Sequence, residues 1–86
     1  GVEFASLVSS SNPGVVVETV KRAESGDGVV VRLYESLGRP ACTTLRTRIP
    51  RTRARETDLL ERPVRELDLD RLELGPFEVL TILLER

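Results

Sequence analysis

The chain has 86 residues, of which 40% are hydrophobic and 31% charged, and its formal net charge is −1. A chain this short forms one domain at most and buries about 60–65% of its unfolded surface, so its stability is small. The near-neutral net charge does not indicate binding to nucleic acid or to an anionic membrane. No apolar run reaches the roughly 18 residues of a transmembrane helix. Because residue 1 is Gly rather than Met, we expect residues 1–86 to be a single domain from a longer, multidomain chain.

Short runs rich in β-branched residues follow one another along the chain, separated by turn-forming residues. The turn signals recur about every ten residues, which is typical of a sandwich or barrel. The one helix-like stretch, residues 55–64, is too short and is interrupted by Pro63, so a turn is expected over residues 58–61. The sequence predicts an all-β fold, a small immunoglobulin-like antiparallel β-sandwich of about seven short strands. The expected strands are residues 2–8, 15–23, 29–36, 41–49, 52–57, 64–74 and 77–85.

The stretch Gly26-Asp27-Gly28 could be a phosphate-binding loop or the tip of a β-hairpin. A dinucleotide-binding loop needs a third glycine and a following helix, and a P-loop needs Gly-Lys-Ser/Thr. Here three valines begin a strand instead, and Asp-Gly between two alternating apolar runs is a strong hairpin signal. We predict a hairpin tip in which one of the glycines has a positive φ.

Alternation within residues 29–36 predicts which side chains face the core. Val29, Val31 and Leu33 fall on one face of this strand, and Arg32 and Tyr34 fall on the other.

The last run, residues 77–85, is apolar on both faces. Val79 and Leu83 share one face, and Leu80 and Ile82 lie on the other. Such a strand is central in a sheet or covered on both sides. A face left uncovered in this chain would be a docking surface.

The residues that usually build catalytic and metal sites are scarce. The chain has no His and one cysteine, Cys42. A single cysteine cannot form an internal disulfide, which favours a reducing compartment and a cytoplasmic location. Cys42 lies in a strand-like stretch, and we expect a small buried hydrophobic residue there rather than a catalytic thiol, because no His is present to activate it.

The sequence assigns no catalytic, cofactor-binding or metal-binding residue. Zinc sites favour clusters of His and Cys. A calcium site at Asp68 and Asp70 lacks a loop to wrap the ion, because a strand would place both carboxylates on one face. We interpret them as solvated charges that flank core leucines. The fourteen carboxylates show no spacing that selects a catalytic pair. A catalytic Ser–Lys pair would have only Lys21 as its base, which is weak support for one.

Six arginines occur without an intervening acid between Gly38 and Glu56. Their alternation predicts that they line one side of two consecutive strands. We interpret them as a solvated sheet face; the alternatives are a contact with carboxylates of a neighbouring domain and a nucleic-acid surface. Nucleic-acid binding would need aromatic rings to stack bases, and carbohydrate binding would need flat rings for sugars, yet the run contains no aromatic residue. The arginines are Arg39, Arg46, Arg48, Arg51, Arg53 and Arg55.

Three stretches together resemble the C-terminal region of glycoside hydrolase family 38, the α-mannosidases. Residues 12–36, NPGVVVETVKRAESGDGVVVRLYES, are similar to a hairpin of that family. Residues 56–63, ETDLLERP, are similar to a leucine-containing segment, with Asp58 where the family pattern has Asn. Residues 72–84, LELGPFEVLTILL, are similar to the closing strand. The three stretches occur in the family's order and cover more than half of the chain.

This resemblance implies a parent enzyme, a zinc-dependent retaining α-mannosidase that acts on mannosides. Zinc and the catalytic residues would belong to an upstream domain, because no position here matches them. The chain itself would be a non-catalytic C-terminal accessory domain, without a cofactor of its own, that gives structural support by packing against preceding domains of the same polypeptide. It would bind neither nucleic acid nor a membrane. The alternative, from the all-β pattern alone, is a free-standing immunoglobulin-like protein-interaction module.

Overall fold

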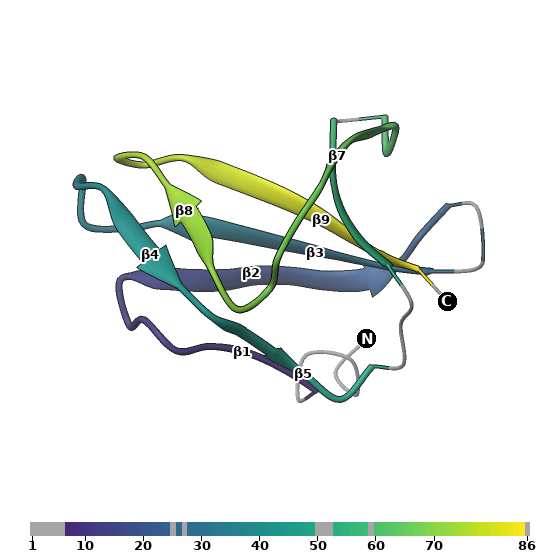
Figure 1. Cartoon of the computed structure of the whole chain (residues 1–86), viewed down its shortest axis with the longest axis horizontal. Coiled ribbons are helices and arrows are strands. Elements are labelled where there is room, and N and C mark those ends of the chain that lie inside the picture. The colour runs from purple at the N-terminus through teal and green to yellow at the C-terminus, as the bar shows by residue number, and fades with distance from the viewer. Residues whose placement is uncertain (1–6, 25, 27, 50–52, 59, 86) are drawn as a thin grey trace.

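A computed structural model of the chain describes residues 7–24, 26, 28–49, 53–58 and 60–85. Within these ranges the chain forms strands and turns (Figure 1). None of the described residues belongs to a helix long and apolar enough to cross a membrane. The strands are β1 (Val8–Ser10), β2 (Val15–Arg22), β3 (Gly28–Glu35), β4 (Ala41–Thr43), β5 (Leu45–Thr47), β6 (Arg53–Thr57), β7 (Pro63–Glu66), β8 (Leu72–Leu74) and β9 (Val79–Glu85).

These strands form two layers. One layer is a five-stranded antiparallel sheet in the order β2-β3-β9-β6-β7, and two small pairs, β1–β5 and β4–β8, form the other. Figure 1 shows β4 and β8 passing across the long strands, while β1 and β5 run below β2 in this view. The prediction of an all-β antiparallel sandwich is confirmed. The described residues contain nine strands rather than about seven, because two of the expected runs each divide into two strands.

The expected run 41–49 divides because it changes partner at Thr44. Before this residue β4 pairs with β8, and after it β5 pairs with β1. Thr44 itself bonds to Ser11: its carbonyl accepts from the Ser11 N–H and its own N–H donates to Ser11 Oγ, both at 3.0 Å. A change of partner leaves the alternation of side chains intact, so the sequence pattern does not reveal it.

The first expected strand, residues 2–8, lies mostly outside the described residues. The structure places β1 at Val8–Ser10, which extends beyond the expected end of that strand at residue 8. The turn follows immediately, where the side chain of Asn12 accepts the Gly14 N–H at 2.8 Å and its carbonyl accepts the Val15 N–H at 3.0 Å. Asn is favoured there because its side chain can mimic a backbone turn.

The core lies between the two layers and draws on both. Val31, Leu33 and Ile82 are fully buried on the inner face of the large sheet, whereas Arg32 and Tyr34 are only partly buried. The face assignment of β3 is therefore confirmed. β9 lies between β3 and β6, so the prediction of a central strand is also confirmed. The full core comprises Val8, Val15, Val20, Val29, Val31, Leu33, Leu45, Ile49, Ala54, Leu69, Leu72, Leu74, Leu80, Ile82 and Leu84.

The hairpin predicted around Gly26-Asp27-Gly28 joins β2 to β3. Its strands pair from Val15↔Glu35 to Arg22↔Val29, with a shift in register between Val17 and Thr19, and the Ala23 N–H donates to the Gly28 carbonyl at 2.9 Å. Gly26 has a φ of 94°, as expected for one of the two glycines; Asp27 lies outside the described residues. The stretch leads into a strand and not into a helix, so it lacks the helix N-terminus that a phosphate loop requires.

The turn between β6 and β7 lies where the sequence predicts it. The Glu61 N–H donates to the Asp58 carbonyl, and the Asp58 N–H donates to the Arg62 carbonyl, both at 3.0 Å. Glu61 reaches the end of β2, where it accepts the Glu24 N–H at 2.9 Å and lies 3.9 Å from Lys21 Nζ. On the outer face of the large sheet, Ala23, Val30 and Leu83 form a second, small buried cluster.

Candidate functional site

Cys42 is exposed, so the expectation of a buried cysteine is wrong. Cys42 pairs with the exposed Glu73 of β8, and both side chains take the outward position. Thr43, only 3% exposed, takes the inward position instead. Its hydroxyl lies 2.7 Å from Ser10 Oγ and accepts the Asn12 N–H at 3.1 Å, so this threonine joins the β4–β8 pair to the β1–β5 pair. In a strand, a shift of one residue exchanges the inner and outer faces.

Asp68 and Asp70 lie in a turn, which corrects the expectation that they share a strand. The Arg71 N–H donates to the Asp68 carbonyl, and the Asp70 N–H donates to Asp68 Oδ1, both at 3.0 Å. Both carboxylates are exposed, and Leu69 between them is buried. Nowhere in the described ranges do three or more His, Cys, Asp or Glu side chains gather as potential metal ligands.

The arginines do not line one face of two neighbouring strands, which corrects a further expectation. Arg46 belongs to β5 in a two-stranded sheet, whereas Arg53 and Arg55 belong to β6 in the five-stranded sheet. Arg51 lies outside the described residues. The run therefore changes layer between residues 47 and 53, and alternation alone could not show this change.

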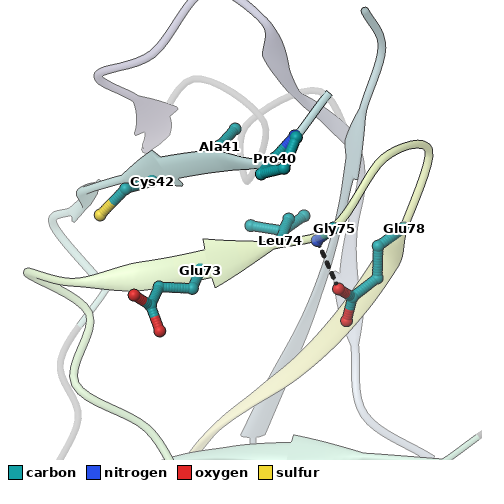
Figure 2. A pocket seen from close by; sticks show the side chains of 7 residues that line it. All are labelled: Pro40, Ala41, Cys42, Glu73, Leu74, Gly75 and Glu78. Atoms are coloured by element: carbon teal, nitrogen blue, oxygen red, sulfur yellow. Dashed lines mark hydrogen bonds between the residues drawn. The ribbon is translucent and has the colours of Figure 1, made fainter. Parts of the chain in front are cut away.

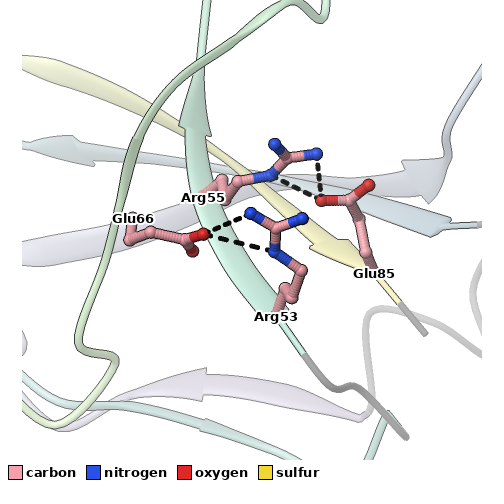
Figure 3. Close-up of polar contacts among 4 residues, drawn as sticks. All are labelled: Arg53, Arg55, Glu66 and Glu85. Atoms are coloured by element: carbon pink, nitrogen blue, oxygen red, sulfur yellow. Dashed lines mark hydrogen bonds and ion pairs between the residues drawn. The ribbon is translucent and has the colours of Figure 1, made fainter.

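Arg53 and Arg55 pair with carboxylates of this same chain (Figure 3). Arg53 Nε lies 3.2 Å from Glu66 Oε1, and Arg55 Nε lies 2.6 Å from Glu85 Oε1. The hydrogen bond that Arg53 donates to Glu66 raises the pKa of the Arg53 guanidinium above its ordinary value, so this group stays charged. Since internal acids already balance these two arginines, they are poor candidates for binding phosphates or the carboxylates of another domain.

An open pocket of about 560 Å³ lies where β4 and β8 approach the start of β9. Two carboxylates, Glu73 and Glu78, line it, but Figure 2 shows Glu73 pointing away from Glu78. Glu78 Oε1 instead accepts the Gly75 N–H at 2.7 Å and closes a local turn. Hydrolysis of a glycoside needs two carboxyl groups directed at one bond, and this pair does not provide that geometry. The pocket is lined by Pro40, Ala41, Cys42, Glu73, Leu74, Gly75 and Glu78.

The most highly organised polar group is the carboxylate of Glu35, which is 1% exposed at the end of β3. Glu35 Oε2 accepts the Leu37 N–H at 2.8 Å, and Oε1 accepts the N–H groups of Gly38 and Arg39 at 2.7 and 3.0 Å. Oε1 also accepts the Phe77 N–H at 3.0 Å. One side chain thus joins the loop after β3 to the turn before β9.

These bonds decide the charge state of Glu35. Burial alone would raise the pKa of its carboxyl, but the backbone N–H groups of Phe77, Leu37, Arg39 and Gly38 together outweigh burial and lower the pKa below its ordinary value. The carboxylate is therefore charged at neutral pH without any nearby Arg or Lys in this set of bonds. Its oxygens are engaged by the protein's own backbone, which indicates a structural role rather than acid–base catalysis.

Sequence reasoning missed Glu35, although a signal was present. The alternation that places Val31 and Leu33 in the core places Glu35 on the same face. An acid at a core-facing position must find donors, and the loop after it, Ser-Leu-Gly-Arg, offers free N–H groups. The donor from Phe77, 42 residues away, was not visible in the sequence.

Comparison with known proteins gives a consistent result. Residues 14–82 match the family model for the C-terminal beta sandwich domain of glycosyl hydrolases family 38. Alpha-mannosidase 2C1 of Homo sapiens is 42% identical over 89 residues, and that of Mus musculus is 39% identical over 88 residues; each match covers 92% of this chain. The chain spans 8% of the length of each relative. No solved structure matches it.

Proposed function

The chain belongs to the C-terminal β-sandwich domains of glycosyl hydrolase family 38, and from this premise we propose that it is a non-catalytic accessory domain of a zinc-dependent, retaining α-mannosidase. The observation that carries the proposal is the family match over residues 14–82, which includes seven of the nine described strands completely and the first part of β9. The two α-mannosidases that resemble it over nearly its whole length support the assignment of the parent activity. The resemblance inferred from the three sequence stretches is thereby confirmed at the level of the family.

The accessory role is supported by the arrangement of the acids. Glu35 is engaged by backbone donors, and Glu73 and Glu78 do not converge. Zinc does not fit the residues of this chain, which has no His and a single cysteine on an exposed strand face. We therefore propose that zinc and the catalytic carboxylates belong to other domains of the polypeptide, and that this domain supports them by packing.

The partners we propose are those other domains, with a mannoside as the substrate of the whole enzyme. Neither nucleic acid nor a membrane is expected as a partner, since the net charge is −1 and Arg53 and Arg55 are paired internally. We propose a cytoplasmic location, for which the lone cysteine is the supporting feature. The family match favours this reading over a free-standing interaction module.

The test is to express the complete open reading frame that encodes this chain and to assay it on an aryl α-mannoside. We expect hydrolysis that a chelator abolishes and zinc restores, with the α-anomer as the first product seen by NMR. The 86-residue chain alone should be inactive with or without zinc. An open reading frame without a glycosidase domain would overturn the proposal, and activity of the isolated chain would overturn its non-catalytic part.

A further inference from the structure

Three large apolar side chains are exposed together at one end of the five-stranded sheet. Leu37, Phe77 and Val79 are 57%, 68% and 54% exposed. The N–H groups of Leu37 and Phe77 donate to the same Glu35 carboxylate, which brings the two residues together. Val79 begins β9 two residues after Phe77. We call these three residues the apolar end patch.

The patch is held in place by a strained backbone. Phe77 has a φ of 57°, in the left-handed region that bulky residues rarely adopt. Its ring lies so close to Gly38 that a Cβ there would be 2.7 Å from Phe77 Cζ. A strained conformation persists only where its surroundings impose it, and such residues cluster at functional surfaces. Here the strain holds an aromatic ring in solvent, where it contributes little to the core of this domain.

The opposite end of the sheet is closed on its outer face. There Val30 and Leu83 are 1% and 6% exposed, beside the contacts that Glu61 makes with the end of β2. On the outer face, β9 is therefore buried at Leu83 and exposed at Val79. Apolar side chains that are exposed together, as Leu37, Phe77 and Val79 are at this end, are typical of a docking surface.

We propose that the apolar end patch docks on a preceding domain of the same polypeptide. This patch would be the docking face of the accessory domain, so the proposal rests on the accessory function proposed above. The chain spans only 8% of the length of its relatives, so most of such a polypeptide lies outside it. Three side chains are a small patch beside the ~800 Å² per partner that a stable free complex buries. A tethered domain needs less area, because the linker keeps its effective concentration high. This argument favours an intrachain partner over a second copy.

Val79 and Val64 allow a matched test, because both are strand valines with similar exposure, 54% and 64%, and only Val79 lies in the patch. Val79→Cys and Val64→Cys would each be made in the complete polypeptide with Cys42→Ser. The rate of alkylation at each site, followed by peptide mass spectrometry, is divided by the rate in the urea-unfolded polypeptide. We expect this ratio to be more than tenfold lower at residue 79 than at residue 64.

Similar ratios at the two sites would overturn the docking proposal. Protection at residue 79 that disappears when the polypeptide is diluted to monomer would assign the patch to a second copy and would also overturn it. The α-mannoside assay separates this result from the proposed function. An active enzyme with a freely alkylated residue 79 refutes only the docking face, and an inactive polypeptide with a protected residue 79 refutes only the parent activity.

Discussion

The carboxylate of Glu35 accepts the backbone N–H of Phe77 at 3.0 Å across 42 residues of sequence. This bond connects the end of β3 to the turn that leads into its neighbour β9, and it fixes the backbone of a residue with a positive φ. The loop after β3, the turn before β9 and the apolar end patch therefore depend on one side chain.

Glu35→Gln should destabilise the domain, because an amide has one acceptor oxygen where the carboxylate has two, so its NH2 group must face at least one backbone N–H and leave it without an acceptor. We expect the melting temperature of the 86-residue chain to fall by about 5 °C or more. Thermal unfolding followed by circular dichroism would measure this change. Glu73→Gln, on an exposed strand position, is the control and should have little effect. Equal melting temperatures for the two variants would contradict the role given to Glu35.

Stability should fall in acid, and Glu35 should account for part of the loss. The pKa values of Glu35 and Asp58 are both lowered in the folded state, the first by backbone N–H groups that outweigh burial and the second mainly by the Arg62 N–H. A carboxyl group whose pKa is lower in the folded than in the unfolded chain stabilises the fold fully when the pH is above its ordinary pKa, which is 4.5 for Glu35 and 3.8 for Asp58. This stabilisation is lost as the pH falls through the pKa of the folded state. Urea midpoints between pH 7 and pH 3 should therefore drop below about pH 4.5, and the drop should be smaller in Glu35→Gln. Parallel profiles for the two proteins would refute this assignment.

Thr57→Val should stabilise the domain. Thr57 is 5% exposed at the end of β6, and its hydroxyl has no hydrogen-bond partner among the residues that the structure describes. Replacing an unpaired buried hydroxyl with a methyl group of similar shape removes a desolvation cost, and we expect a gain of about 1 kcal/mol in the free energy of unfolding. Urea denaturation would measure it. A loss of stability would mean that the hydroxyl has a partner after all.

Gly26→Ala should destabilise the domain, whereas Gly75→Ala should be neutral or stabilising. Gly26 has a φ of 94° with open space around it, so a Cβ there costs only backbone strain, about 1 kcal/mol. A Cβ at Gly75 would make only an ordinary contact, 3.5 Å from Glu78 Oε1, and its φ is outside the left-handed region. There the substitution reduces the entropy of the unfolded chain and should be neutral or stabilising by up to about 1 kcal/mol. The two unfolding curves would fall on the same side of the wild type only if this explanation is wrong.

The strands with strong alternation were predictable from the sequence. Val29, Val31 and Leu33 occupy the expected face, the hairpin at residues 26–28 forms with one positive φ, and β9 is central. These features depend on local chemistry and on a period of two residues.

Alternation from the core residue Leu45 places Thr43 inward and Cys42 outward, so the exposure of Cys42 was predictable. The other errors arose where pairing partners decide the structure: the run 41–49 divides because it moves from one sheet to another. The sequence analysis named an uncovered face of the run 77–85 as a docking surface, but it did not place Leu37 beside Phe77, because the two residues are brought together by Glu35. Contacts between distant segments depend on topology, which periodicity does not encode.

The central place of β9 also has a consequence for synthesis on the ribosome. This strand leaves the exit tunnel after the other eight strands described here, yet it pairs with both β3 and β6. Until it emerges, the nascent chain carries two unpaired strand edges that could join another chain. The β2–β3 hairpin can close early, because its pairing is local, whereas the large sheet must wait for its last strand. A ribosome that stalls before residue 79 would therefore leave a split sheet, and such an intermediate is a natural target for chaperones.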